Sequence, residues 1–145
     1  MFHDQSLSVI TPFKGKAINE LKDSVMSLIN QTYLRIDHIV VIERASYENA
    51  KNLFQTLDID NKNYFYRLYI SNNKGIYTSI NQALDILEDS QPYLVIGAGD
   101  IMKINAKVKF DSSNKIYYLP YCLSSDVEIL IDNFRNIFMG MPYCH

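Results

Sequence analysis

The sequence is poor in the features that identify several large classes of protein. It has only two cysteines, Cys122 and Cys144, and no Cys-x-x-Cys pair, so we expect no disulfide framework. Free thiols are typical of a reducing compartment, and we expect a cytoplasmic protein. No apolar run approaches the ~20 residues that a membrane-spanning helix needs. Residues 1–5 have neither a basic start nor an apolar core, so we expect no signal peptide there.

An excess of charge of one sign is also missing. The chain has 14 Lys and Arg against 16 Asp and Glu, a net charge of −2 at pH 7, and its lysines are scattered along the sequence. Nucleic-acid-binding domains carry a basic patch or stripe, so we expect no nucleic-acid partner. A phosphate-binding loop of the Walker type is absent from the sequence as well.

What the chain does contain is a regular alternation of predicted strands and helices. Its 145 residues, 48% of them apolar, fit one domain with a single core. We predict strands at residues 7–11, 36–42, 64–70 and 93–96, the first of them ending at Pro12. The helices between them have apolar stripes, and Ser46 is the expected N-cap of the second. These stripes are Ile18, Leu21, Val25, Leu28 and Ile29; Ala50, Leu53, Phe54 and Leu57; and Tyr77, Ile80, Leu84 and Leu87.

The alternation predicts an α/β fold, a Rossmann-like α/β/α sandwich with a mainly parallel sheet. After Asp100 the pattern changes, and we expect a small β addition there. Residues 106–111 alternate between apolar and charged side chains, as in a half-exposed strand, and residues 116–123 are its expected neighbour. Residues 126–141 favour a strand followed by a short helix.

The ends of the predicted parallel strands are where a ligand site is expected. In open parallel sheets, ligands bind outside the carboxyl ends of the strands. Two acids, Glu43 and Asp100, follow two of these strands. The three residues before Asp100, at positions 97–99, are small. Lys74 and Gly75 precede a helix whose N-terminal amides favour phosphate. Acids for a cation, amides for phosphate and bare glycines suit a nucleoside diphosphate with its metal.

Each of these features also has a simpler interpretation. Gly99 and Asp100 alone are most often a turn or a helix cap. Glu43 alone is usually a solvated acid at a strand end. Lys74 and Gly75 alone are an ordinary loop. Only their order on one alternating pattern favours a binding site.

Six segments in sequence order resemble the family 2 glycosyltransferases, the nucleotide-sugar transferases with the GT-A fold. Residues 24–33 resemble the helix end S-[VI]-x-x-Q-[TS]-[YF], residues 69–81 resemble S-E-x-D-x-G-I-Y-D-A-M-N, and residues 95–100 resemble the L-N-A-G-D form of the metal motif. The matching segments are SVITPF (8–13), SVMSLINQTY (24–33), IVVIERAS (39–46), YISNNKGIYTSIN (69–81), VIGAGD (95–100) and GMPYCH (140–145). The match covers nearly the whole chain.

The resemblance implies a single GT-A-like domain over residues 1–145 and assigns roles to particular residues. Asp100 would hold Mg²⁺ or Mn²⁺ against the diphosphate. Thr11, Pro12, Phe13 and Glu43 would form the floor for the nucleoside. The remaining nucleotide-sugar contacts would come from Asn73, Lys74, Gly75, Gly97, Ala98 and Gly99. His145 is the one histidine near a family motif and a weak candidate to reach the metal or the acceptor, against the simpler interpretation of a residue in a terminal segment.

The implied activity is that of a metal-dependent hexosyltransferase. It would move a sugar from a nucleoside diphosphate, UDP above all, to an acceptor hydroxyl with inversion, in polysaccharide or glycoconjugate synthesis. The acceptor would be a carbohydrate or a lipid-linked sugar, met in the second case at the inner face of the membrane. The family's general base lies in a segment after the acceptor-side strands. We therefore expect this chain to be a fragment of a longer protein, the alternative being a naturally short and defective one.

The departures from the family pattern keep a second function class open. Glu43 stands where the family usually has Asp, Asn73 and Thr78 stand in place of two further acids, and Gly97 replaces a frequent Asn. Each loss of an acid removes negative charge from the expected cleft, as in a binding module that kept the fold and lost catalysis. A nucleotidyltransferase is a third class, but it would need a glycine-rich basic loop, and residues 11–16 hold one glycine.

Overall fold

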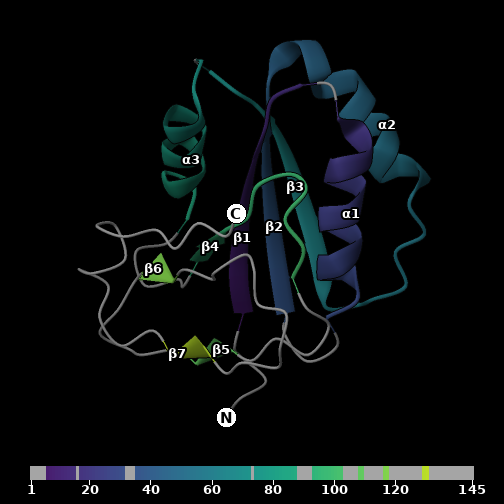
Figure 1. Cartoon of the computed structure of the whole chain (residues 1–145), viewed down its shortest axis with the longest axis vertical. Coiled ribbons are helices and arrows are strands. Elements are labelled where there is room, and N and C mark those ends of the chain that lie inside the picture. Colours follow the sequence, from purple (N-terminus) through teal and green to yellow (C-terminus); the bar gives the residue numbers. More distant parts are fainter. Residues whose placement is uncertain are drawn as a thin grey trace.

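The structure is a computed structural model, and it describes residues 6–15, 17–31, 35–72, 74–87 and 93–102 together with three two-residue strands that follow (Figure 1). The larger elements are β1 (Ser6–Phe13), α1 (Ile18–Ile29), β2 (Arg35–Ile42), the 3-10 turn η2 (Arg44–Ser46), α2 (Tyr47–Thr56), β3 (Tyr64–Ile70), α3 (Ile76–Leu84) and β4 (Tyr93–Val95). The short strands are β5 (Val108–Lys109), β6 (Ile116–Tyr117) and β7 (Ile129–Leu130). None of the helices in this described part has the length and apolarity to cross a bilayer.

Within the described residues, five strands form one sheet in the order β3-β2-β1-β4-β6. Every neighbouring pair in it is parallel. The longest pairing joins β1 and β2, from Ser6 opposite Arg35 to Phe13 opposite Ile42. The predicted α/β class with a mainly parallel sheet is therefore confirmed.

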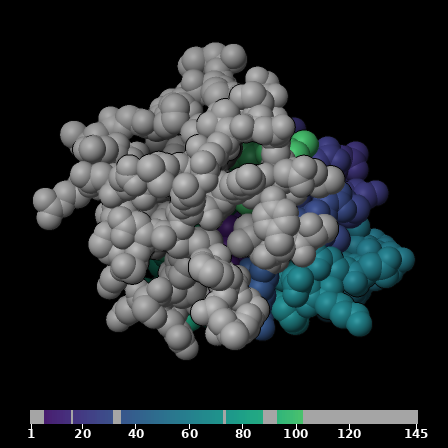
Figure 2. All heavy atoms as spheres, turned by 90° about the horizontal axis from the view of Figure 1, so that it is seen from below, coloured from purple at the N-terminus to yellow at the C-terminus, as the bar shows by residue number. Residues whose placement is uncertain are grey.

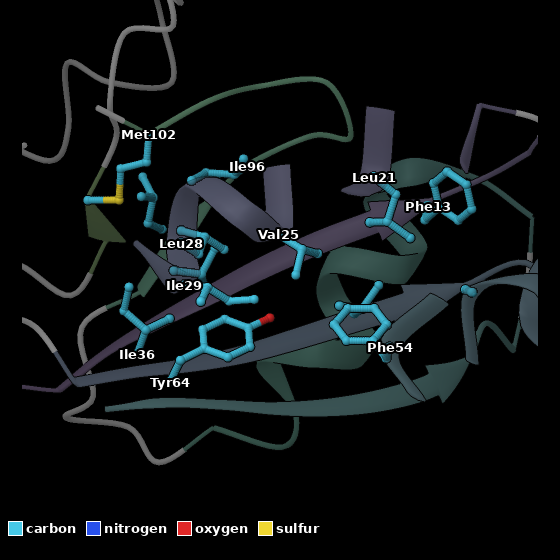
Figure 3. Packing of buried hydrophobic residues seen from close by; sticks show 14 of the residues in the cluster. Phe13, Leu21, Val25, Leu28, Ile29, Ile36, Phe54, Tyr64, Ile96 and Met102 are labelled. Atoms are coloured by element: carbon cyan, nitrogen blue, oxygen red, sulfur yellow. The ribbon is translucent and has the colours of Figure 1, made fainter. Parts of the chain in front are cut away.

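The helices lie on both faces of this sheet. α1 and α2 cover one face and α3 the other (Figure 1). The larger core cluster lies under α1 and α2, and Figure 3 shows Phe13, Leu21 and Val25 among its side chains. The smaller cluster joins Ile10, Ile39 and Val41 to α3. This division follows from the alternation of side chains along a strand, which sends neighbouring residues to opposite faces.

The end of α1 is tied to the connection between α2 and β3. The Nδ2 atom of Asn61 donates to the carbonyls of Ile29 and Gln31, at 2.7 and 2.6 Å. The last carbonyls of a helix have no N–H partners within the helix. The Asn61 side chain therefore supplies a hydrogen-bond donor at the end of α1. Figure 2 shows this edge of the molecule from below, with the connection from α2 to β3 in teal.

The first strand runs further than its sequence predicts. Pro12 does not end β1, since it pairs with Val41 and the strand continues to Phe13. The carbonyl of Phe13 accepts from the Glu43 amide on the β2 side, so alternation turns the position of the missing Pro12 amide toward β4. The pairing of β1 with β4 reaches only Ile10 opposite Val95. Proline is tolerated because its neighbour strand has ended there.

Two predictions on the helices need correction in detail. Ser46 occupies the N-cap position of α2 as predicted, but its hydroxyl bonds to the backbone of Gly15 and not to the helix. Tyr77 does not belong to the packed face of α3, since it is 73% exposed. The buried positions of α3 are Ser79 and Ala83, and Ile80, Leu84 and Leu87 pack beside them. The predicted faces of α1 and α2 are confirmed.

The strands after Asp100 pair differently from the prediction. Residues 116–117 form β6, which joins the main sheet beside β4 rather than pairing with residues 108–109. Residues 108–109 form β5, which pairs in parallel with β7 in a separate two-stranded sheet. The expected small β addition is present, but with another partner. Most of residues 126–141, including the predicted short helix, lie outside the described residues.

A buried histidine joins the three strands under α1 and α2. His38 of β2 is completely buried, with Nε2 2.7 Å from the Thr11 hydroxyl on β1 and Nδ1 2.7 Å from the Tyr64 hydroxyl on β3. Burial lowers the pKa of His38 to about 3, so the ring is neutral at pH 7. A neutral imidazole has one donor and one acceptor nitrogen, so one hydroxyl donates to the ring and the other accepts from it. Burial also raises the pKa of Tyr64, which keeps its proton.

We expect the stability of the protein to fall as the pH is lowered from 6.5 toward 5. The unfolded chain protonates His38 near its ordinary pKa of 6.5, whereas the folded chain resists protonation until about pH 3. Because the unfolded state then binds the extra proton, His38 alone lowers the free energy of unfolding by about 0.7 kcal/mol per pH unit at pH 6.5, and the slope rises toward about 1.4 kcal/mol per pH unit near pH 5. Urea unfolding at several pH values measures this slope.

His38→Gln should remove that contribution to the slope. Thr11→Val is the matched control, since it takes away one hydrogen bond but leaves the histidine buried. It should lower stability by about 1–3 kcal/mol at every pH and keep the wild-type slope. Equal slopes for the wild type and His38→Gln would contradict the assignment.

Candidate functional site

The carboxyl ends of the parallel strands bring four loops to one edge of the sheet. Because the order is β3-β2-β1-β4, the described residues of these loops follow each other along the edge as 71–72 with 74–75, 43–46, 14–15 with 17, and 96–102. The two ends of this row are three strand spacings apart, ~14 Å. A ligand that touches all four loops must therefore be extended along the edge.

The order of the strands reverses between β1 and β4. β2 and β3 are added on one side of β1, and β4 lies on the other. Ligands of open parallel sheets bind in the crevice at such a switch point. The loop after β4, which carries Asp100, is one of the two loops that flank it. Strand order is not written in the sequence, so this coincidence appears only in the structure.

Asp100 closes a tight turn with its own carboxylate. Oδ2 accepts a hydrogen bond from the Gly97 amide at 2.8 Å, and the Asp100 amide donates to the Gly97 carbonyl at 3.1 Å. Burial raises the pKa of the half-buried Asp100 carboxyl, and the bond from Gly97 opposes this with a smaller effect. Among the described residues, Oδ1 has no hydrogen-bond partner. One oxygen thus shapes the turn, and the other is not used by this part of the chain.

Gly97 and Gly99 of this turn are glycine for different physical reasons, the first because of space and the second because of backbone conformation. A Cβ on Gly97 would lie 2.9 Å from Asp100 Oδ2, so a side chain there would displace the carboxylate. Gly99 has φ +95, a conformation that favours glycine, and the space beside it is bounded by Glu20. Ala98 is half-buried and packs against the larger core.

Two serines of α1 hold this turn against the helix. Ser24 Oγ donates to the Gly97 carbonyl at 3.2 Å and accepts from the Gly99 amide at 2.8 Å. Ser27 Oγ accepts from the Met102 amide at 3.1 Å. Both serines are buried on the apolar face of the helix. Their contribution was not predicted, although small polar residues at positions i and i+3 of an apolar stripe were a signal for it.

The loops after β1 and β2 are also tied together. Ser46 Oγ donates to the Gly15 carbonyl at 3.0 Å and accepts from the Gly15 amide at 3.2 Å. Glu43 is half-buried, and its backbone bonds to Phe13 and Ser46. Arg44 is exposed. Glu43 is therefore the first residue of a hydrogen-bonded loop after β2, and this loop lies next to the loop that follows β1.

The four residues predicted to form the floor for the nucleoside differ in burial: two are buried in the protein and two have surface at the edge. Thr11 is completely buried and bonds to His38, and Phe13 is 4% exposed in the larger core (Figure 3). Their side chains support the edge from below and do not line it. Pro12 and Glu43 are half-buried and are the two of the set with surface at the edge.

The loop before α3 offers backbone amides. Lys74 and Gly75 are exposed, and Gly75 has φ +117 at the N-cap position, where no side chain caps the helix. The first amides of a helix have no partner within it, and its dipole favours an anion there. The Thr78 hydroxyl is 3.4 Å from the Lys74 carbonyl. Asn73 and His145 lie outside the described residues.

The acidic side chains described at this edge could hold a metal ion only together with ligand atoms of a substrate. Over the ranges that the structure describes, no group of three or more His, Cys, Asp or Glu side chains could hold a metal. Mg²⁺ is often bound by one or two carboxylates together with the phosphates of a substrate. Asp100 alone fits a cation that arrives with a diphosphate, and it does not fit a site built from protein ligands alone.

No protein-family model matches this chain, and a search of the curated proteins found no match either. The functional argument therefore depends on the motifs and on the geometry of this edge.

A double-mutant cycle tests the turn. Gly97→Ala should lower the free energy of unfolding because its Cβ meets the Asp100 carboxylate at 2.9 Å. In an Asp100→Ala background the obstacle is gone, and the same change should cost less, with a coupling of about 1 kcal/mol. Urea unfolding of the four proteins measures both values. Additive effects would show that Asp100 does not fold back on Gly97.

Proposed function

We propose that this chain binds a nucleoside diphosphate sugar along the carboxyl edge of its sheet and acts as a metal-dependent, inverting glycosyltransferase of the GT-A type. UDP is the expected carrier. The observation that supports this most is the half-buried carboxylate of Asp100, which lies on a glycine turn beside the switch point of a parallel sheet and uses only one of its oxygens within the described residues. The six motifs of the sequence point to the same chemistry.

The length of the edge matches the shape of such a donor. A nucleotide sugar is an extended molecule with a base, a ribose, a diphosphate and a sugar in a row. In the proposed arrangement the base lies near Pro12 and Glu43, and the diphosphate lies at the switch point near Asp100. Glu43 would accept a hydrogen bond from an N–H of the base, as a carboxylate can. The amides at the start of α3 would face the ribose or a phosphate.

Asp100 would orient the diphosphate through its cation. Oδ2 would stay on the Gly97 amide, which fixes the direction of the carboxylate, and Oδ1 would point to the cation. Mg²⁺ or Mn²⁺ held there would supply positive charge to offset the negative charge that develops on a leaving diphosphate. Gly97 and Gly99 would let the diphosphate approach the backbone closely because they have no side chain in the way.

The acceptor side has no assigned residue among those described. The proposed acceptor is a hydroxyl of a carbohydrate or of a lipid-linked sugar, and a general base must lie within hydrogen-bond distance of that hydroxyl. His145 remains a weak candidate for this role.

A binding module without catalysis is the second candidate function. Asn73 and Thr78 stand where the resembling family has acids, and one oxygen of Asp100 is already used by the turn. Both candidates bind the donor, but only the enzyme releases UDP from it. An assay for UDP release from UDP-sugars, with and without acceptor, separates them.

Calorimetric titration with UDP tests the role of Asp100. In the presence of Mn²⁺, Asp100→Ala should weaken UDP binding at least about tenfold, which is about 1.4 kcal/mol. Without metal, its affinity should equal that of the wild type, because Asp100 acts through the cation. Asp85→Ala, which changes an exposed acid just beyond α3, is the control and should bind as the wild type does. Unchanged affinity of Asp100→Ala with Mn²⁺ would reject the metal assignment.

A further inference from the structure

Ser24 occupies a central place in the turn that carries Asp100. Its hydroxyl donates to the Gly97 carbonyl and accepts from the Gly99 amide, so it holds the backbone on both sides of Ala98. The Gly99 amide also lies 3.1 Å from the carbonyl of Glu20, one turn earlier in α1. Gly97 is therefore held at both of its polar groups, by Asp100 at its amide and by Ser24 at its carbonyl.

The position of Ser24 on α1 makes a purely stabilising role a poor explanation. It is completely buried on the face that carries Leu21, Val25 and Leu28. An apolar side chain at this position would add to the core, whereas a buried hydroxyl needs partners to offset the loss of water. Those partners are the two peptide groups that flank Ala98, in the turn whose Gly97 amide binds the Asp100 carboxylate.

We propose that Ser24 is a positioning residue for the contact of Asp100 with a metal-bound diphosphate. This inference rests on the proposed function. Ser24 does not touch the ligand; it holds Gly97 and Gly99 so that the Asp100 carboxylate keeps its orientation when a cation binds at Oδ1. Loss of the hydroxyl lets the turn adopt other conformations, and the cation then has to select the competent one, which weakens its binding.

Ser27 provides a matched comparison on the same helix. It is buried like Ser24, and its hydroxyl donates to the Ser24 carbonyl within α1 at 2.7 Å. Its partner outside the helix, however, is the Met102 amide, two residues beyond Asp100. Removal of Ser27 should therefore disturb packing to a similar extent without releasing the turn itself.

The experiment measures UDP affinity with and without Mn²⁺ for the full chain and for Ser24→Ala, Ser24→Thr and Ser27→Ala. Ser24→Ala should weaken the metal-dependent part of the affinity about tenfold, the size of one lost hydrogen bond of the stronger kind. Ser27→Ala should change it less than about twofold, and Ser24→Thr, which keeps a hydroxyl, should recover most of it. Affinity without metal should be the same in all four proteins.

Equal losses in Ser24→Ala and Ser27→Ala, or no loss in Ser24→Ala, would overturn the inference and leave the proposed function intact. A wild-type chain that shows no metal-dependent UDP binding would reject the proposed function and, with it, the role of Ser24 in binding. Amide hydrogen exchange without ligand gives an independent readout of the turn. Faster exchange of the Gly99 amide in Ser24→Ala but not in Ser27→Ala would support the hold on the turn, and unchanged exchange would contradict it.

Discussion

The parallel pairing of β1 with neighbours on both sides is the constraint on which the site depends. It aligns the ends of β2 and β4 with the end of β1, and β3 follows through β2. Since parallel strands end at the same edge, residues as far apart in the sequence as Pro12 and Asp100 lie along one edge. The buried bonds of His38 to Thr11 and Tyr64 join β1, β2 and β3 under α1 and α2.

The turn at residues 97–100 combines two demands on one carboxylate. As a turn former, Asp100 binds the Gly97 amide and stabilises the loop. As a proposed ligand, it must present the other oxygen to a cation. The two roles are compatible because a carboxylate has two oxygens and because α1, through Ser24, fixes the backbone on which the carboxylate is mounted. The simple interpretation of Asp100 as a turn residue and the functional one thus describe the same geometry.

Much of the architecture was predictable because it follows from local periodicity. The stripe of Leu21, Val25 and Leu28 specifies a helix and its buried face, and the β-branched run in β2 specifies a strand covered on both sides. The errors fell where tertiary contacts compete with local rules. Pro12 stays in a strand because its neighbour has ended, Ser46 bonds to Gly15 instead of capping a helix, and Tyr77 is exposed at the start of α3.

The order of residue types along the chain is enough to predict the α/β class, the loops at the strand ends and the acid of the glycine-rich segment. Three further facts are visible only in the folded chain: β4 lies next to β1, Asp100 bonds to Gly97, and Ser24 and Ser27 bond to residues 97–102. These facts depend on which strands and helices become neighbours, and hydrogen bonds between residues about 75 positions apart leave no periodic signal in a single sequence.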